Sequence, residues 1–185
     1  MPNSTAKNRA LALPVINKAA FDYEINSERR MAGWLTTLAI ESGELRYQEE
    51  IASGAAYEGR KDLGNTQKGD GRRFKGHGRI QITGRSNHQA YTNYLKKNKH
   101  LQFIDFVTHP ELLALEPYAT DSAGWFWAIK VKNNSAIDAG DFHKTQIRVN
   151  GINKKTGNPN HWVERQNYYA RSLSAFNKSR GGKDR

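Results

Sequence analysis

The sequence predicts a mainly α-helical protein that folds as one domain. Its 185 residues fit a single domain of ordinary size, and its 37% apolar and 25% charged residues are typical of globular proteins. Apolar residues recur at helical spacing in several segments, whereas Arg79 to Thr83 is the one segment that alternates as a strand does. The sequence contains no internal repeat and no low-complexity linker. We therefore expect one domain over residues 1–176 and a flexible basic tail over residues 177–185.

Two helices are expected near the start of the chain. The first covers much of Ala6 to Tyr23, with Pro14 either kinking it or starting its second part. Ser27 can cap the second, which should end near Ser42-Gly43. Its apolar residues recur at i, i+3, i+4, i+7 and i+8 and form one face: Met31, Trp34, Leu35, Leu38 and Ala39.

The rest of the chain alternates between helices and irregular segments. Six of the sixteen glycines lie between Gly59 and Gly78, a segment without apolar periodicity, and such long loops are usually functional or mobile. Arg79 to Thr83 can form one arm of a small hairpin. Further helices are expected over Ser86 to Lys97, Tyr118 to Lys130, Asp141 to Val149, and from a cap at Asn160 through Phe176.

The charge is positive and unevenly distributed. There are 29 Lys and Arg against 18 Asp and Glu, a net charge of +11, and Lys144 to Arg185 alone carries +8. Such a basic region indicates an anionic partner, which by charge alone can be a nucleic acid, an acidic glycan or a membrane surface.

Several classes of protein are excluded by missing signals. The absence of cysteine excludes disulfides, thiolate nucleophiles and Cys-containing zinc sites. No apolar run has the length of a membrane span or signal peptide, and the Gly71 to Gly76 segment lacks the Lys and Ser/Thr of a P-loop. The six histidines show no metal-ligand spacing, so we expect no metal and no cofactor.

A cluster of carboxylates is the strongest chemical signal. Glu41 continues the apolar face of the second helix, where partial burial would favour a protonated carboxyl group. One protonated and one ionised carboxyl group across a cleft can cleave a glycosidic bond. Tyr47, Tyr57 and Arg46 can line a sugar cleft. Five of the eighteen acidic residues fall in this region: Glu41, Glu44, Glu49, Glu50 and Glu58.

The order of motifs resembles glycoside hydrolase family 19, the chitinase-like enzymes, and most closely its phage endolysin branch. The similarity covers roughly Ala20 to Phe176. The segments that carry it are Glu41-Ser-Gly-Glu-Leu-Arg-Tyr-Gln-Glu-Glu50, Tyr57-Glu-Gly-Arg-Lys-Asp-Leu-Gly-Asn65, Gly69-Asp-Gly71, Gly76-His-Gly-Arg-Ile-Gln-Ile-Thr-Gly-Arg85, Ala139-Gly-Asp-Phe142 and Ile147-Arg-Val-Asn-Gly151, followed by Arg165 and Tyr169.

The resemblance implies a lysozyme-like, two-lobed α-helical fold and an inverting mechanism. Glu41 occupies the general-acid position, Glu50 matches the base, and Thr83 matches the residue that helps hold the attacking water, unless it is simply a β-branched strand residue. Glu58 is the rival base, unless it forms an ion pair with Arg60 or Arg79. Four polar residues match positions that contact sugar or orient the carboxylates, with an ordinary structural hydrogen bond as the alternative for each: Gln81, Asn87, Asn150 and Arg165. With these we group Tyr47, Tyr57, Glu58 and Arg60 as candidate substrate-binding residues.

The sequence departs from the family pattern at three places. Glu44 stands where family members commonly have glycine, so a third carboxyl group can face solvent or raise the pKa of Glu41. The usual G-R-G is Gly76-His-Gly78, and the usual N-G-G is Asn150-Gly-Ile152. These departures affect the expected subsite geometry and leave the expected reaction unchanged.

The resemblance and the composition together suggest a phage endolysin. We expect a monomeric muramidase made in the host cytoplasm, which reaches peptidoglycan after a holin-type opening of the membrane and contacts the anionic cell envelope through its basic region. The lactyl and peptide carboxylates of peptidoglycan give that region an acidic partner, and we expect no nucleic-acid partner. The alternatives are a chitinase-like enzyme acting on N-acetylglucosamine polymers and a non-enzymatic basic domain that binds nucleic acid.

Overall fold

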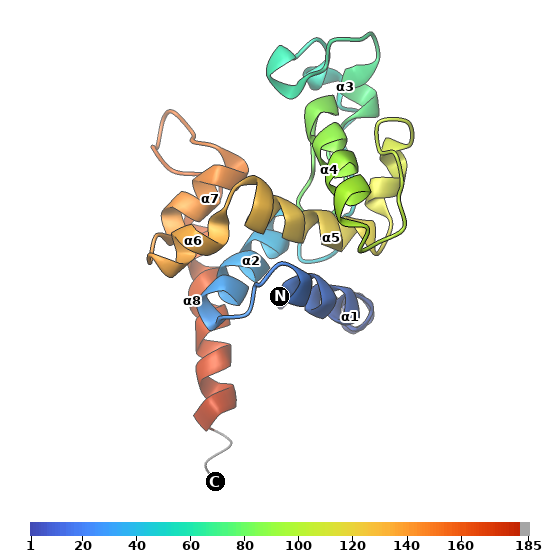
Figure 1. Ribbon diagram of the computed structural model, residues 1–185. Helices are drawn as coiled ribbons and strands as arrows, with labels where there is room; N and C mark the ends of the chain where they lie inside the picture. The colour runs from blue at the N-terminus through green and yellow to red at the C-terminus, as the bar shows by residue number, and fades with distance from the viewer. Residues whose placement is uncertain (182–185) are drawn as a thin grey trace.

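The computed structural model describes residues 1–181, and it is mainly helical, as predicted (Figure 1). The α-helices are α1 (Ala6–Asp22), α2 (Glu28–Glu41), α3 (Asp70–Arg73), α4 (Arg85–Asn98), α5 (Tyr118–Trp125), α6 (Asn133–Asp138), α7 (Phe142–Asn150) and α8 (Trp162–Gly181). Short 3-10 helices span Ala55–Tyr57, Lys61–Leu63 and Pro110–Ala114, and a π-helix, Phe126–Lys130, extends α5.

The central element is α2, which packs against α6, α7 and α8. Ser27 caps it as predicted, since its hydroxyl accepts a hydrogen bond from the Arg30 N–H at 3.2 Å. Trp34 and Leu38 are fully buried, and Gly33 lets the Trp127 ring approach so closely that a Cβ there would lie 3.1 Å from it. A helix buried on most of its circumference gives its last residue, Glu41, a fixed position.

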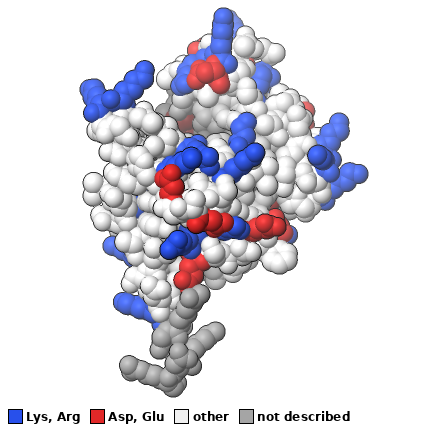
Figure 2. All heavy atoms as spheres, turned by 60° about the vertical axis from the view of Figure 1, so that its left-hand side comes forward, with Lys and Arg blue, Asp and Glu red and all other residues white. Residues whose placement is uncertain are grey.

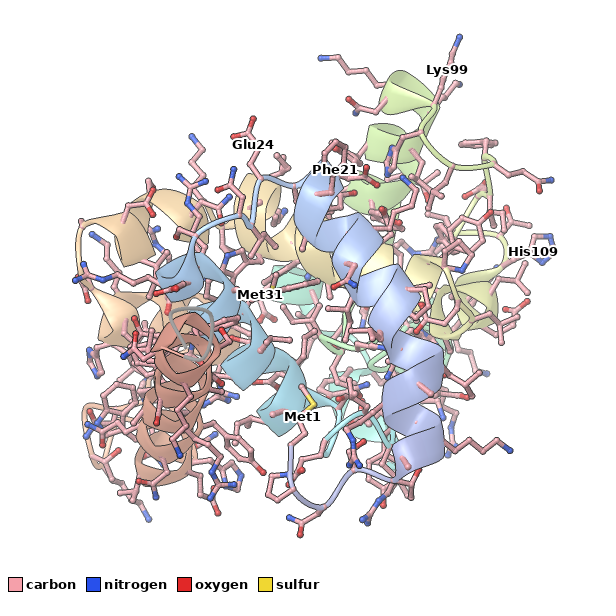
Figure 3. The ribbon with its side chains drawn as sticks, turned by 90° about the horizontal axis from the view of Figure 1, so that it is seen from below. Met1, Phe21, Glu24, Met31, Lys99 and His109 are labelled. Carbon is pink, nitrogen blue, oxygen red and sulfur yellow. The ribbon has the colours of Figure 1, made fainter. Side chains whose placement is uncertain are left out.

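Helix α1 runs without interruption through Pro14 and covers one side of the core. The Thr5 side chain caps it by accepting the Asn8 N–H at 3.0 Å. Ala12 and Ile16 are buried, whereas Leu13 and Phe21 are exposed. Viewed from below, α1 and α8 lie on opposite sides of α2 (Figure 3). A cavity of about 540 Å³ between these three helices has an apolar lining and contains none of the predicted site residues.

Three helices differ from the sequence-based expectation. The Tyr118 to Lys130 helix changes from α to π geometry at Phe126, and α6 was not expected because its six residues are too few to show a period. Asn160 does not cap α8, because its Oδ1 accepts from the Asn153 Nδ2 at 3.2 Å and the helix begins two residues later.

The predicted basic tail falls largely within α8. Residues 177–181 continue this helix to Gly181, beyond the end expected at Phe176. The rest of the tail, residues 182–185, lies outside the described residues.

The predicted hairpin is reduced to a tight turn. No strand forms within residues 1–181, where isolated antiparallel bridges join His77 to Glu49 and to Ile82. The His77 N–H donates to the Ile82 carbonyl at 3.1 Å, and the Ile82 N–H donates to the His77 carbonyl at 2.8 Å. Gln81 has a φ of 58°, which reverses the chain too sharply for an extended arm.

The turn belongs to a part of the molecule that stands apart from α6, α7 and α8. Figure 1 shows α3 and α4 on one side of the central helices and α7 with its following loop on the other. The segment 42–49 leads from the end of α2 to Glu50, which lies beside this turn. The two carboxylates with predicted catalytic roles therefore lie at the two ends of one short connection.

Candidate active site

Glu41 is held at the end of α2 by an arginine from α8. The Arg165 Nη2 donates to the Glu41 Oε1 at 2.6 Å, and the exposed fractions of the two side chains are 0% and 15%. The partial burial expected for Glu41 is confirmed. Its arginine partner could not be predicted from the helical spacing that placed Glu41 on the packed side.

The remaining donors of Arg165 fix the guanidinium. Its Nη1 donates to the Gln146 Oε1 at 2.8 Å, and its Nε donates to the Asn160 carbonyl at 2.8 Å. The Gln146 Nε2 in turn donates to the Thr37 hydroxyl at 3.2 Å. Arg165 is thus an orienting residue for Glu41, one of the two roles that the resemblance allowed it, and Gln146 is a member of this site that sequence analysis missed. Its signal was a polar residue on the buried face of the Asp141 to Val149 helix.

Glu50 has a separate set of donors. The Gly76 N–H donates to its Oε2 at 2.9 Å, and the Tyr57 hydroxyl donates to its Oε1 at 3.0 Å. Burial, followed by the hydrogen bond to the Glu50 carboxylate, raises the pKa of Tyr57. The backbone is fixed as well, because the Glu50 N–H donates to the Gly76 carbonyl at 2.8 Å and the Lys75 Nζ donates to the Glu50 carbonyl at 3.0 Å.

Three more predicted residues contact the turn from Gly76 to Thr83, whose Gly76 amide binds Glu50. A Cβ at Gly76 would lie 2.6 Å from the Gln81 Oε1, so glycine lets Gln81 pack against the peptide that binds Glu50. The Thr83 hydroxyl donates to the Gln81 carbonyl at 2.9 Å, and the Asn87 Nδ2 donates to the Thr83 carbonyl at 2.9 Å. Gln81 and Asn87 therefore make structural hydrogen bonds that shape this turn.

Glu58 binds backbone amides of the glycine-rich loop. Its Oε1 accepts from the Gly69 N–H at 2.6 Å and its Oε2 from the Gly71 N–H at 2.8 Å, next to the start of α3. The alternative ion pairs with Arg60 and Arg79 are wrong. Arg60 pairs with Asp62 at 2.5 Å, and Arg79 pairs with Glu116 at 2.7 Å.

Glu44 is buried and does not face solvent. The Asn3 N–H and Nδ2 each donate to its carboxylate at 2.7 Å, and the Tyr168 hydroxyl also donates to it. Burial acts to raise the pKa of Glu44, but these donors outweigh it and lower the pKa. Burial, followed by the hydrogen bond to Glu44, raises the pKa of Tyr168 to about 12. Glu44 thus joins the N-terminal segment to α8.

Tyr47 and Asn150 lie away from the donors of Glu50. Tyr47 is 37% exposed, packs on Gly43, and lines a pocket of about 360 Å³ with Ile40 and His161. The Asn150 Oδ1 accepts from the Asn160 N–H at 2.9 Å and closes the loop between α7 and α8. The structure therefore gathers two clusters, one around Glu41 and one around Glu50, with Tyr47 and Asn150 at the edge of the first.

Residues 1–181 contain neither a candidate metal site nor a candidate membrane span. No group of three His, Asp or Glu side chains there could hold a metal ion. None of the helices in this part of the chain has the length and apolar character needed to cross a membrane.

The fold is that of the family 19 chitinases, although no family model matches the sequence. Chitinase C from Streptomyces griseus superposes with a TM-score of 0.71 at 20% identity, over 94% of this chain and 71% of that one. A bacterial family 19 chitinase, described as differing from the plant enzymes, superposes with a TM-score of 0.70 at 20% identity, over 87% of this chain and 84% of that one. The lysozyme-like helical fold implied by the sequence motifs is thereby confirmed.

Proposed function

We propose that this protein is a glycoside hydrolase that cleaves β-1,4 bonds between N-acetylated sugars. The observation that carries the proposal is the pair Glu41 and Glu50, two carboxylates with separate donor sets at the two ends of segment 42–49, in the fold of family 19 chitinases. Glu41 acts as general acid and Glu50 as general base. In an inverting enzyme such a pair stands roughly 6.5 to 9.5 Å apart, which leaves room for a water molecule.

The reaction follows from what each carboxylate can do. Glu41 gives its proton to the glycosidic oxygen as the bond from that oxygen to the anomeric carbon breaks. Glu50 takes a proton from a water whose oxygen bonds to the same carbon from the opposite face, which inverts the anomeric configuration. Solvent then returns a proton to Glu41 and takes one from Glu50.

Arg165 and the donors of Glu50 support these roles. As the proton leaves Glu41, negative charge develops on its carboxylate, and the guanidinium 2.6 Å away stabilises that charge. Because Arg165 binds Oε1, we assign the transferred proton to Oε2. The Gly76 amide and the Tyr57 hydroxyl orient Glu50 toward the attacking water. Thr83 provides the second contact of this water.

Peptidoglycan is the substrate we favour, and the biological role we infer is that of a phage endolysin. The motifs from Glu41 to Arg85 are most similar to the phage branch of the family, and the net charge of +11 suits a glycan that carries carboxylates. The structural neighbours are chitinases by name, which makes chitin the competing substrate.

The test is lysis of purified peptidoglycan, followed by turbidity, with identification of the new reducing end. We expect N-acetylmuramic acid at that end and slower hydrolysis of chitin oligomers. Preference for chitin oligomers would make the protein a chitinase, and N-acetylglucosamine at the new end of peptidoglycan would change the bond assigned.

The carboxylate roles need variants that keep the fold. Glu41→Gln and Glu50→Gln preserve shape but cannot transfer the proton, and general acid or base catalysis contributes roughly 10²- to 10⁴-fold. Glu24→Gln is the matched control, because Glu24 is exposed and Figure 3 shows it on the outside of the molecule. Lysis by Glu41→Gln close to that of the control, with unchanged circular dichroism, would remove Glu41 from its role.

The positive charge gives a second measurable property. Figure 2 shows Lys and Arg distributed over the face it presents, with Asp and Glu between them, rather than gathered into one patch. Contact with an anionic cell envelope is then long-range attraction, which salt screens over about 8 to 10 Å. Removal of residues 177–185 should slow lysis of walls more at low salt than at high salt and leave hydrolysis of a short neutral oligosaccharide unchanged. If wall lysis by the truncated protein and by the full-length protein depends equally on salt, residues 177–185 have no role in this attraction.

A further inference from the structure

Two histidines form a buried pair beside the turn that holds Glu50. The His77 Nδ1 lies 3.0 Å from the His88 Nε2, and the exposed fractions of the residues are 2% and 0%. The rings meet at 90° with centroids 5.2 Å apart, and the His88 ring also packs on Phe74. The reaction proposed above uses neither ring, and His77 stands where the resembled family usually has arginine.

The contacts determine which nitrogen carries each proton. The His88 Nδ1 is 2.9 Å from the Gly84 carbonyl, which can only accept, so this nitrogen must donate. In a neutral His88 ring the Nε2 is then an acceptor, and the His77 Nδ1 must donate to it. The result is a one-directional series of hydrogen bonds from His77 through His88 to the carbonyl of Gly84, the residue before α4.

The backbone of His77 lies between the amide that binds the proposed base, Glu50, and the end of the turn at Thr83. Its neighbour Gly76 donates to the Glu50 Oε2, and its own N–H and carbonyl pair with Ile82, the residue before Thr83. The orientation of the His77 ring is therefore coupled to both groups that are expected to place the attacking water, Glu50 and Thr83.

We propose that His88 is a positioning residue, which acts through His77 to hold the Gly76 amide and Thr83 in register with Glu50. The proposal rests on the proposed function for its kinetic consequence, whereas the proton positions and the rigidity of the turn do not depend on it. The arrangement requires a neutral His88 ring, because a proton on the His88 Nε2 would face the His77 Nδ1–H. Burial lowers the pKa of both rings, which fits this requirement. The charged or titratable groups that act on His77 are Glu49, Glu50, Lys75, His88 and Glu111.

The first test reads the protons directly by ¹⁵N NMR of the histidine rings at neutral pH. We expect a proton on Nδ1 and a bare Nε2 in both His77 and His88. A His88 ring protonated at Nε2 instead, or one that gains a second proton between pH 7.0 and 5.0, would overturn the proposal.

The second test separates positioning from stability. His88→Gln keeps a donor and an acceptor in one side chain, whereas His88→Leu keeps neither, and His109→Gln is the exposed control. Hydrogen exchange at the Gly76 amide should be at least about tenfold faster in His88→Leu than in His88→Gln, with exchange in α8 unchanged. Equal exchange at Gly76 in the two variants would show that the pair only fills space.

The kinetic arm links the pair to catalysis. In His88→Leu kcat on peptidoglycan fragments should fall about tenfold or more with KM within about twofold, because water placement and not sugar binding is disturbed. His88→Gln should recover most of kcat. If KM rises and kcat is unchanged, or if both variants lose activity only in proportion to their loss of folded protein, the positioning role is wrong. If His88→Leu does not fold, His88→Gln and the ring protons of the wild type decide the question. If the wild type itself cleaves no glycan, the proposed function fails, while NMR and exchange still decide on the pair.

Discussion

Arg165 and Glu41 are 124 residues apart in sequence and 2.6 Å apart in space. Helix α8 brings the arginine to the end of α2, where it is fully buried and binds three acceptors from three segments of the chain. The pair therefore ties the last helix to the residue that we assign as general acid. Its loss should affect both stability and activity.

Arg165→Ala should be among the more destabilising single substitutions in this protein. It leaves Glu41 without its buried cationic partner, and breaking a buried ion pair typically costs about 3 to 5 kcal/mol. The free energy of unfolding in urea measures this cost. Arg72→Ala, at an exposed arginine of α3, should change it by less than about 0.5 kcal/mol. A similar small change for both variants would mean that Arg165 does not contribute through this network.

Glu58→Gln should lower stability and leave the chemistry intact. The amide side chain can accept one of the two glycine N–H groups, so one amide at the start of α3 loses its partner, at a cost of about 1 to 3 kcal/mol. Lysis by the folded variant should stay within about threefold of wild type, far from the loss expected on removal of a general base. A hundredfold or greater loss with an unchanged unfolding curve would return the base to Glu58.

Thr83 should tolerate serine better than valine. Its hydroxyl hydrogen is donated to the Gln81 carbonyl, which leaves the oxygen to accept a hydrogen from water. Thr83→Ser keeps that oxygen and should retain much of the activity, whereas Thr83→Val should lose about a hundredfold or less. Initial rates on soluble peptidoglycan fragments measure both. Wild-type rates for the valine variant would reduce Thr83 to a packing residue.

Stability should fall in mild acid because of His88. Burial lowers the pKa of this ring from its ordinary value of 6.5 to about 3, so between these values the unfolded chain binds a proton that the folded protein does not. The contribution is complete above pH 6.5 and is lost as the pH falls toward 3, at about 1.4 kcal/mol per pH unit. Urea unfolding at pH 7.0 and 5.0 should show the difference, and His88→Gln should remove about 2 kcal/mol of it. The same pH dependence in the wild type and in His88→Gln would contradict the assignment.

The sequence predicted best what depends on local pattern. The cap at Ser27 and the apolar face with Trp34 and Leu38 define α2 by spacing alone, and the structure places both as expected. Short or irregular elements were beyond this reasoning. Helix α6 has six residues and follows Lys132 in the left-handed region, and the turn at Gln81 also depends on a positive φ that its side chain does not predict.

Partners of the candidate site residues were predicted least well. Glu58 lies two residues from Arg60 in sequence, yet it binds glycine amides that come near it because the loop folds back. Glu44 is one of a row of exposed-looking acids, yet Asn3 and Tyr168 reach it from the two ends of the described chain. Motif resemblance placed the carboxylates, but it contains no information about which distant donor each one meets.

The contacts of Glu44 and Glu41 have a consequence for synthesis on the ribosome. Domains generally fold as units as the chain emerges from its N-terminal end. Asn3, Glu41 and Glu44 emerge early, whereas the side chains from α8 that complete both carboxylate sites, Arg165 and Tyr168, emerge late. A nascent chain that has been made only as far as α7 would lack the Arg165 donor of Glu41 and the Tyr168 donor of Glu44. Glu41 would acquire its partner only with α8, so a partly synthesised enzyme should be inactive.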